Sequence, residues 1–447
     1  MQDTTLWQTY RSQVYESFTR GADALFNLAD ALLAESQGKS LAELSLSPFF
    51  ERQWSSVYEA LEDGKIDVQR LRQAGVRALL ADKGDHNPIC IAIDTSGVKR
   101  DDADTSEDRG IIHVSNLPQV DKPIAVGWTF SSVVLLPDGP SSWAPILDQK
   151  RVPTSQTPIQ VAIKQLKALR PLLGDRPVTV LADRAYGTPQ FLRACLELGY
   201  RVIVRIKSNR KLYRPGGIRI HKNGPTPKDG ALFQGKNKQT HGQPEAVCHQ
   251  QDHKGRPIGI SRFGNLHFKE DRELSVKVIG VECESAKGTK RDPRLSWFVT
   301  LDEQIPLQQI PTRYALRFCV EHAYRFLKQD LLWTSVHVRT PEQFERWSWL
   351  VAIAFNQLYL ARDLGQATYH PWERKDRPLT PRQVRRVMPT LLCQLGTPAR
   401  PCQPRGIAPG RAAGFHPKPA QRFPVIVKNP KNPKKKKKPA VPLQSSA

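Results

Sequence analysis

Two short apolar runs, each closed by an aspartate, constrain the fold of this chain more than any other feature. Residues 88–94 read PICIAID and residues 177–183 read PVTVLAD. Apolar runs of this length without polar alternation are typical of strands buried on both faces, as in a sheet covered by helices. Ligands of such sheets bind at the carboxyl ends of the strands, so we expect Asp94 and Asp183 to share one edge of the sheet.

The segments around these runs alternate between strand and helix patterns. We predict further strands at 110–114, 124–136 and 200–206, and helices at 155–173 and 188–198. Thr157-Pro158 and Thr188-Pro189 are typical helix starts. Three strands, a helix, a strand, a helix and a strand fit an α/β fold with a mixed five-stranded sheet flanked by helices.

The stretch from Tyr314 to Lys328 contains no Gly or Pro and is predicted to form a single amphipathic helix. One narrow face carries four polar groups, on Tyr314, Arg317, Glu321 and Lys328. At about 100° per residue, Arg325 lies within about 40° of Glu321. A carboxylate among bases suits a metal ligand beside a polyanion. The plainer alternative is that these side chains form solvated ion pairs with one another.

The rest of the chain divides by composition into segments of different character. Residues 1–86 are predicted to form an N-terminal helical bundle, a candidate for DNA contact that its charge does not establish, and 87–207 the first part of the α/β core. Residues 208–308, rich in Gly, Pro, Lys and His, are predicted to be a β-rich insertion. The core resumes at 309–365, a helical segment follows at 366–396, and 397–447 is predicted to be a disordered basic tail.

Charge and hydropathy limit the partners of the chain. The formal net charge is +24, and half of this excess lies between Arg400 and Ala447, where there is no Asp or Glu. Such an imbalance favours nucleic acid as the partner. Seven scattered Cys residues suit a reducing cytoplasm. No apolar run is long enough to span a bilayer, so we expect a cytoplasmic, nucleoid-associated protein with no membrane contact.

Asp94, Asp183 and Glu321 together offer a hard, anionic, all-oxygen ligand set. Such ligands select Mg²⁺, with Mn²⁺ as a substitute, over softer metals. A pair of these ions can activate the attacking oxygen and stabilise the leaving oxygen in phosphodiester chemistry. Three acids in one chain are weak evidence alone, since the two aspartates could simply cap turns.

The local motifs around these acids resemble those of a known family. Tyr314-x2-Arg317-x3-Glu321-x6-Lys328 resembles the Y-R-E-K signature of insertion-sequence DDE transposases of the cut-and-paste, hairpin-forming group. Residues 183–187 (DRAYG) resemble the second-aspartate motif of that family, and residues 91–96 (IAIDTS) the first. The resemblance covers about residues 88–365.

This resemblance implies a ribonuclease-H-like fold with Asp94, Asp183 and Glu321 as catalytic metal ligands. It also implies that Tyr314, Arg317 and Lys328 hold phosphates near the transposon end, with Arg325 beside them. The implied partners are the terminal inverted repeats, target DNA and a second copy of the chain in a synaptic complex.

Other residues have less defined expectations. Arg184 and Tyr186 are expected to support the second aspartate or contact DNA. Relatives stack an aromatic from the insertion on a flipped base, which makes Trp297 a candidate, although a core tryptophan fits its pattern almost as well. His241, Cys248, His249 and His253 match no standard zinc spacing. The run Lys434–Lys438 is expected to add salt-sensitive DNA affinity.

We therefore expect a DNA transposase that binds inverted repeats, cleaves element ends through a hairpin and transfers strands with two Mg²⁺ ions. Two alternatives remain open. One is a related metal-dependent nuclease without strand transfer, and the other is a catalytically silent, repurposed DNA-binding protein.

Overall fold

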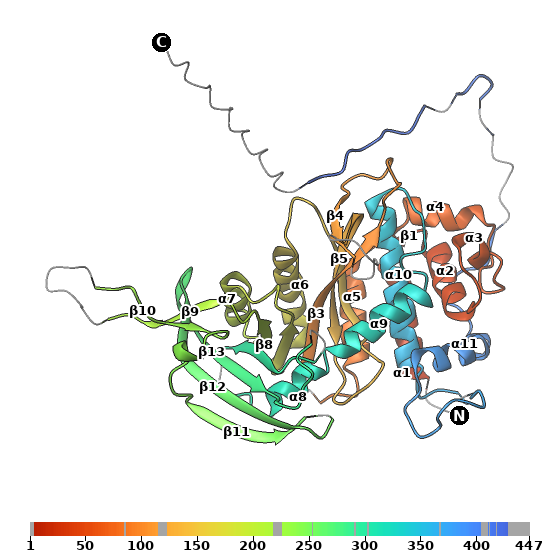
Figure 1. The fold of residues 1–447 in the computed structure, drawn as a ribbon. Helices are drawn as coiled ribbons and strands as arrows, with labels where there is room; N and C mark the ends of the chain where they lie inside the picture. The colour runs from red at the N-terminus through yellow and green to blue at the C-terminus, as the bar shows by residue number, and fades with distance from the viewer. Residues whose placement is uncertain are drawn as a thin grey trace, which may run out of the picture.

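The computed structural model describes residues 4–84, 86–114, 123–217, 226–252, 254–289, 292–301, 304–365, 368–403, 410, 412–416 and 418–427. It is a mixed α/β fold in which the central strands lie between the helical N- and C-terminal parts on one side and the strands of the insertion, which continue the same sheet, on the other (Figure 1). None of the helices in these ranges is both long and apolar enough to cross a membrane.

The first part of the chain is helical, as predicted. Its elements are α1 (Thr5–Ser17), β1 (Phe18–Arg20), α2 (Ala22–Ala34), α3 (Leu41–Leu44), α4 (Ser55–Asp63), β2 (Lys65–Ile66) and α5 (Val68–Leu79). Asp67 caps α5 by accepting hydrogen bonds from the backbone N–H groups of Gln69 and Arg70. The apolar faces of these helices share one core with helices from the end of the chain, so the boundary near residue 86 does not separate two cores.

The central strands are β3 (Ile89–Lys99), β4 (Gly110–His113), β5 (Ile124–Leu135), β6 (Ile146–Val152), β7 (Val178–Ala182) and β8 (Arg201–Ile206). β3 pairs parallel with β7 and antiparallel with β5, and β7 pairs parallel with β8. The mixed sheet is confirmed in type but not in detail. β6, which pairs with β5, was not predicted, because its sequence ILDQKRV is apolar only at its ends.

Two helices connect the parallel strands on the face where their apolar sides are buried. α6 (Pro158–Leu173) begins at Thr157, whose side chain forms a capping box with Gln160. α7 (Pro189–Glu197) begins at Thr188. Both starts agree with the Thr-Pro signals in the sequence.

The insertion is β-rich, as expected, but it is not a separate sheet. Its strands are β9 (Lys211–Pro215), β10 (Asp229–Gln234), β11 (Ala246–Gln251), β12 (Pro257–Phe268), β13 (Asp271–Glu282) and β14 (Leu295–Thr300), with a short 3-10 turn at Lys238–Thr240. β14 pairs antiparallel with β8, so the insertion continues the central sheet. The sheet reaches 12 strands within the described residues, and the expectation of five is therefore too small.

The segment predicted as a single helix from Tyr314 to Lys328 is two helices, α8 (Gln309–Ala315) and α9 (Phe318–Gln329). Leu316 and Arg317 form the junction, with ψ of −22° at both residues. The N–H groups here donate three residues back, as when Val320 bonds to the carbonyl of Arg317. This is 3-10 geometry, which tightens the backbone without reversing it.

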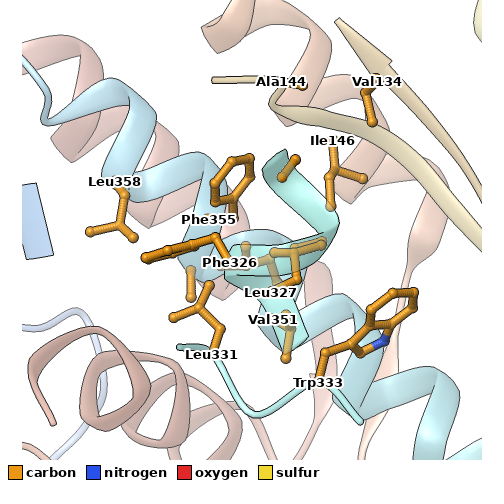
Figure 2. Close-up of a cluster of buried hydrophobic side chains, with 14 of the residues drawn as sticks. Val134, Ala144, Ile146, Phe326, Leu327, Leu331, Trp333, Val351, Phe355 and Leu358 are labelled. Carbon is orange, nitrogen blue, oxygen red and sulfur yellow. The ribbon is translucent and has the colours of Figure 1, made fainter. Parts of the chain in front are cut away.

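The apolar face of α9 packs between the sheet and α10 (Pro341–Leu360). Figure 2 shows Phe326 and Leu327 of α9 against Phe355 and Val351 of α10, with Ile146 of β6 above them. The rings of Phe326 and Phe355 lie 5.8 Å apart. α11 (Pro381–Leu395) then closes the helical part, and Thr340 and Thr380 cap α10 and α11 with complete capping boxes.

The expected disorder of the tail is wrong for one described segment. The N–H of Phe423 donates to the carbonyl of Asp104, and the N–H of Ile426 donates to that of Arg109, each at 2.8 Å. The buried Arg109 guanidinium donates to the carbonyl of Phe423. Residues 423–426 thus lie along the edge of β4 as a strap, with a bridge from Ile426 to Gly110. The run Lys434–Lys438 lies outside the described residues.

Candidate active site

Asp94 and Asp183 are neighbours because the register of β3 and β7 places them side by side. Ile93 pairs with Ala182 in the parallel ladder, and each aspartate is the next residue along its strand. β3 does not end at Asp94, as was expected, but continues to Lys99 while paired with β5. Asp183 begins a turn, in which its Oδ1 accepts a hydrogen bond from the N–H of Ala185 at 2.9 Å.

Arg317 connects the helical segment to this sheet edge. Its Nη2 donates to Oδ2 of Asp94 at 2.8 Å, and both side chains are less than one-fifth exposed. The position of Arg317 at the α8–α9 junction directs the guanidinium to the strand rather than to solvent. The alternative of a solvated pair between Arg317 and Glu321 is not observed, since the described partner of Arg317 is Asp94.

Glu321 lies one turn further along α9 and is exposed. Burial raises the pKa of the Asp94 carboxyl, the Arg317 guanidinium opposes this shift, and the Asp183 and Glu321 carboxylates add to it. All three acids therefore belong to one electrostatic cluster. Mutual repulsion among its members favours binding of a cation.

Two buried tyrosines lie next to the acid cluster. The hydroxyl of Tyr324 donates to the backbone carbonyl of Asp94 at 3.1 Å, and its ring stacks on Trp333 with centroids 5.7 Å apart. Tyr186, 2% exposed, packs its ring on Phe191. Burial raises the pKa of both phenols, with the Asp94 carboxylate adding to the effect.

The two tyrosines differ in how far the sequence anticipates them. Tyr186 donates its backbone N–H to the carbonyl of Asp183 at 3.1 Å, and its buried ring is not exposed to an external ligand. Tyr324 is missing from the expected site, although on a helical wheel it lies about 60° from Glu321, on the side of Arg317. This position on the polar side of the helix was the sequence signal that could have identified Tyr324 as a site residue.

The remaining residues of the Y-R-E-K pattern flank the acids. The half-buried Tyr314 ring meets Phe298 edge-on, with centroids 4.7 Å apart. Burial raises the pKa of its phenol, and Arg317 and Arg205 oppose the shift. The ammonium of Lys328 lies 6.0 Å from the Tyr324 ring centroid, and burial lowers its pKa.

Arg184 and Arg325 are exposed. Within the described ranges, neither has a hydrogen bond or ion pair to another side chain. Both are thus available to an external anion, but the structure does not bring them into the acid cluster.

Trp297 is a core residue, which corrects the expectation that it stacks on a flipped base. Its side chain is 4% exposed, and its ring lies among Phe233, His241 and Phe263. A Cβ at Gly235 would lie 2.6 Å from its Nε1, and one at Gly280 would lie 2.9 Å from its Cζ3. Only glycine leaves room for the indole at these two positions.

The donor chemistry of the three acids fits a hard divalent cation, but their present arrangement does not close around one. Among the described residues, no three Asp, Glu, His or Cys side chains are near enough to hold a metal ion. Arg317 already donates to Oδ2 of Asp94, so a cation at this carboxylate would have the guanidinium as a neighbour and competitor.

Comparisons with known proteins identify the family. No curated protein sequence matches this chain. The structure titled "Cryo-EM structure of piggyBac transposase synaptic complex with hairpin DNA (SNHP)" aligns over 89% of this chain and 80% of that chain, with 10% sequence identity and a TM-score of 0.40. A similarity this low does not by itself support a shared function.

The family model described as DDE superfamily endonuclease matches residues 13–262, more than half of the chain. The match contains Asp94 and Asp183 and ends before Glu321. The chain belongs to the DDE superfamily endonucleases.

Proposed function

We propose that this protein is a DNA transposase of an insertion sequence, which cleaves the ends of its element and joins them to target DNA. The observation that carries the proposal is the paired register of Asp94 and Asp183, with Arg317 bonded to one of them, in a chain of the DDE superfamily endonucleases. The net charge of +24 supports DNA as the partner.

The core strand order β6-β5-β3-β7-β8 supports a ribonuclease-H-like assignment for the catalytic part. Asp94, Asp183 and Glu321 would hold two Mg²⁺ ions, with Mn²⁺ as a substitute. When bound, such ions activate the attacking oxygen and stabilise the leaving one. Tyr314 and Lys328 flank the acids and would contact phosphates on either side of the scissile bond.

Arg317 has two alternative partners in this proposal. Without metal it neutralises Asp94, and with metal and DNA it turns to a phosphate, which accepts two parallel hydrogen bonds from a guanidinium. The Asp94–Arg317 pair would thereby be replaced by an Asp94–metal pair and an Arg317–phosphate pair, so the buried carboxylate would never be left without a counter-charge.

The substrates in this proposal are the terminal inverted repeats and a target duplex, bound by a homodimer in a synaptic complex. We also propose that the ends are cleaved through a hairpin intermediate and that the protein acts at the nucleoid, in the cytoplasm.

Strand transfer is the step that separates a transposase from a simple nuclease. The test is to incubate the protein and Mg²⁺ with pre-cleaved element ends and a plasmid, and to measure joined products. We expect joining by the wild type and none by Asp183→Ala, with end binding retained. Cleavage without joining would favour a nuclease, and binding without either reaction would favour a repurposed DNA-binding protein.

A further inference from the structure

The loop between α10 and α11 displays a tryptophan in solvent. Trp372 is 77% exposed, the second most exposed large apolar side chain among the described residues. Its ring lies flat on the imidazole of His370, with centroids 4.7 Å apart and planes 9° from parallel. One face of the indole is therefore supported, and the other is open to a further planar group.

The loop is held in this shape from below. The Glu373 carboxylate accepts two hydrogen bonds from the Arg386 guanidinium of α11, at 2.6 and 2.7 Å. It also accepts one from the N–H of His370 at 3.0 Å. These bonds fix the turn that carries Trp372, and they engage the carboxylate of the residue that follows it in sequence.

Three basic residues follow Trp372 within the next five positions of the loop. Arg374, Lys375 and Arg377 are exposed, and in the described part of the chain none of them is paired with a carboxylate. Asp376 is the remaining acid of the loop. A surface with three available cations and one acid beside an open aromatic face is complementary to a nucleic acid rather than to a typical protein surface.

A cavity of about 460 Å³ lies beside the loop. Arg377, Trp143, Tyr359 and Arg362 line it, together with Ser141. The carbonyl of Ser141 accepts a hydrogen bond from Sγ of Cys319 at 3.0 Å, and Cys319 is two residues before Glu321. The cavity thus places the loop next to the segment that contacts the first turn of α9, which carries the third acid, and its lining includes both Arg362 and its ion-pair partner Asp363.

We propose that residues 370–377 form a second DNA-contact site, separate from the acid cluster, in which Trp372 stacks on an unpaired base next to a DNA end or nick. Arg374 and Lys375 hold the adjacent phosphates. The base must be unpaired, because bases inside a duplex are covered on both faces. The inference rests on the proposed function for the identity of the nucleic acid.

The test is equilibrium binding of the full-length protein to two labelled DNAs in EDTA, so that no cleavage occurs. One is a duplex whose two ends are closed by polyethylene glycol linkers, which carry no unpaired bases, and the other is the same duplex with a single-stranded overhang. Stacking of one base is worth ~1 kcal/mol or more, so we expect the wild type to bind the overhang DNA about fivefold or more tightly.

The variants separate stacking from charge. Trp372→Ala should lose the preference for the overhang, whereas Trp54→Ala, a matched exposed tryptophan on the N-terminal helices, should keep it. The double variant Arg374→Ala/Lys375→Ala should keep the preference for the overhang but bind both DNAs more weakly. The slope of its log binding constant against log salt concentration should fall in magnitude by about two, one for each lost phosphate contact.

The inference is overturned if the wild type shows no preference, or if Trp372→Ala retains it. If Trp372→Ala altered the oligomeric state measured by sedimentation but left DNA binding unchanged, the loop would be a contact between copies of the chain instead. Because these measurements need no catalysis, a chain that binds as expected but never cleaves would contradict the proposed function and leave this inference standing.

Discussion

The Arg317 guanidinium donates to Oδ2 of Asp94 at 2.8 Å, so a basic residue of the Y-R-E-K pattern pairs with a carboxylate that we propose as a metal ligand. The pair is mostly buried, which makes each partner costly to leave alone. Arg317 also lies at the 3-10 junction between α8 and α9. In the proposed function, the Arg317 guanidinium and the metal ion compete for the Asp94 carboxylate.

Removal of the guanidinium should strengthen metal binding in the absence of DNA. In Arg317→Ala, Asp94 loses its partner, and the free energy of unfolding should fall by about 1–3 kcal/mol without metal. Addition of Mn²⁺ should then raise the melting temperature more than it does in the wild type. Thermal melts with and without Mn²⁺ measure this difference.

Arg325→Ala is the control for this experiment, because Arg325 is exposed on the same helix and has no side-chain partner in the described residues. Its response to Mn²⁺ should equal that of the wild type. An equal response of Arg317→Ala would show that Arg317 does not compete with the metal.

Trp297→Ala should act on stability rather than on any single step of DNA processing. The indole fills the space between Gly235 and Gly280, and its loss leaves a cavity in the insertion. We expect the free energy of unfolding to fall by about 3–5 kcal/mol. Urea denaturation measures it. A fully stable variant that fails only in hairpin formation would instead restore the base-stacking role.

Arg385 is expected to be a structural arginine of the helical part. Its buried guanidinium donates to the carbonyls of Leu32 and Glu35 at the end of α2, and to that of Asp330 after α9. Arg385→Ala removes these bonds and should lower the free energy of unfolding by about 3 kcal/mol. Arg382→Ala, which removes an exposed pair with Asp330, should cost less than about 1 kcal/mol. Similar losses in both variants would contradict this assignment.

The Glu373–Arg386 pair should give the Trp372 loop a specific acid sensitivity. The Arg386 hydrogen bonds, together with the N–H of His370, lower the pKa of Glu373 to about 2. Because the pKa of Glu373 is lower in the folded chain than in the unfolded chain, its ionised carboxylate stabilises the fold at any pH above the unfolded pKa, near 4.5. This contribution is lost as the pH falls from 4.5 toward 2. The melting temperature of Glu373→Gln should thus lie below that of the wild type at pH 6.

This gap should narrow steadily between pH 4.5 and pH 2.5 as Glu373 takes up a proton in the wild type. A gap that stays constant over this range would show that the carboxylate does not stabilise the loop through its charge. Comparison of the two proteins at each pH removes the general effect of acid on the fold.

The sequence was most informative where a local rule determines the structure. Two apolar runs closed by aspartate predicted the adjacency of Asp94 and Asp183, because β3 and β7 pair in parallel with these runs in register, although β3 itself continues to Lys99. Thr-Pro pairs predicted the starts of α6 and α7, because the cap uses only neighbouring backbone groups.

Features that depend on distant contacts were missed. The Arg317–Asp94 pair joins residues 223 positions apart, and the helix break that permits it has no Gly or Pro. β6 lacks a strand pattern of its own and is defined by its pairing with β5. Trp297 is buried because two glycines far from it in sequence leave room for its ring.

The measurement that tests the central claim most directly is the nicking of a supercoiled plasmid with Mn²⁺, by the wild type and by Asp94→Asn, Asp183→Asn and Glu321→Gln. We predict metal-dependent nicking by the wild type and a loss of at least about 100-fold in each variant, since each removes a proposed ligand of the catalytic metal. Asp138→Asn, at an acid with an 84% exposed side chain, should nick at the wild-type rate. Nicking that persists in EDTA, or that survives all three substitutions, would contradict the account.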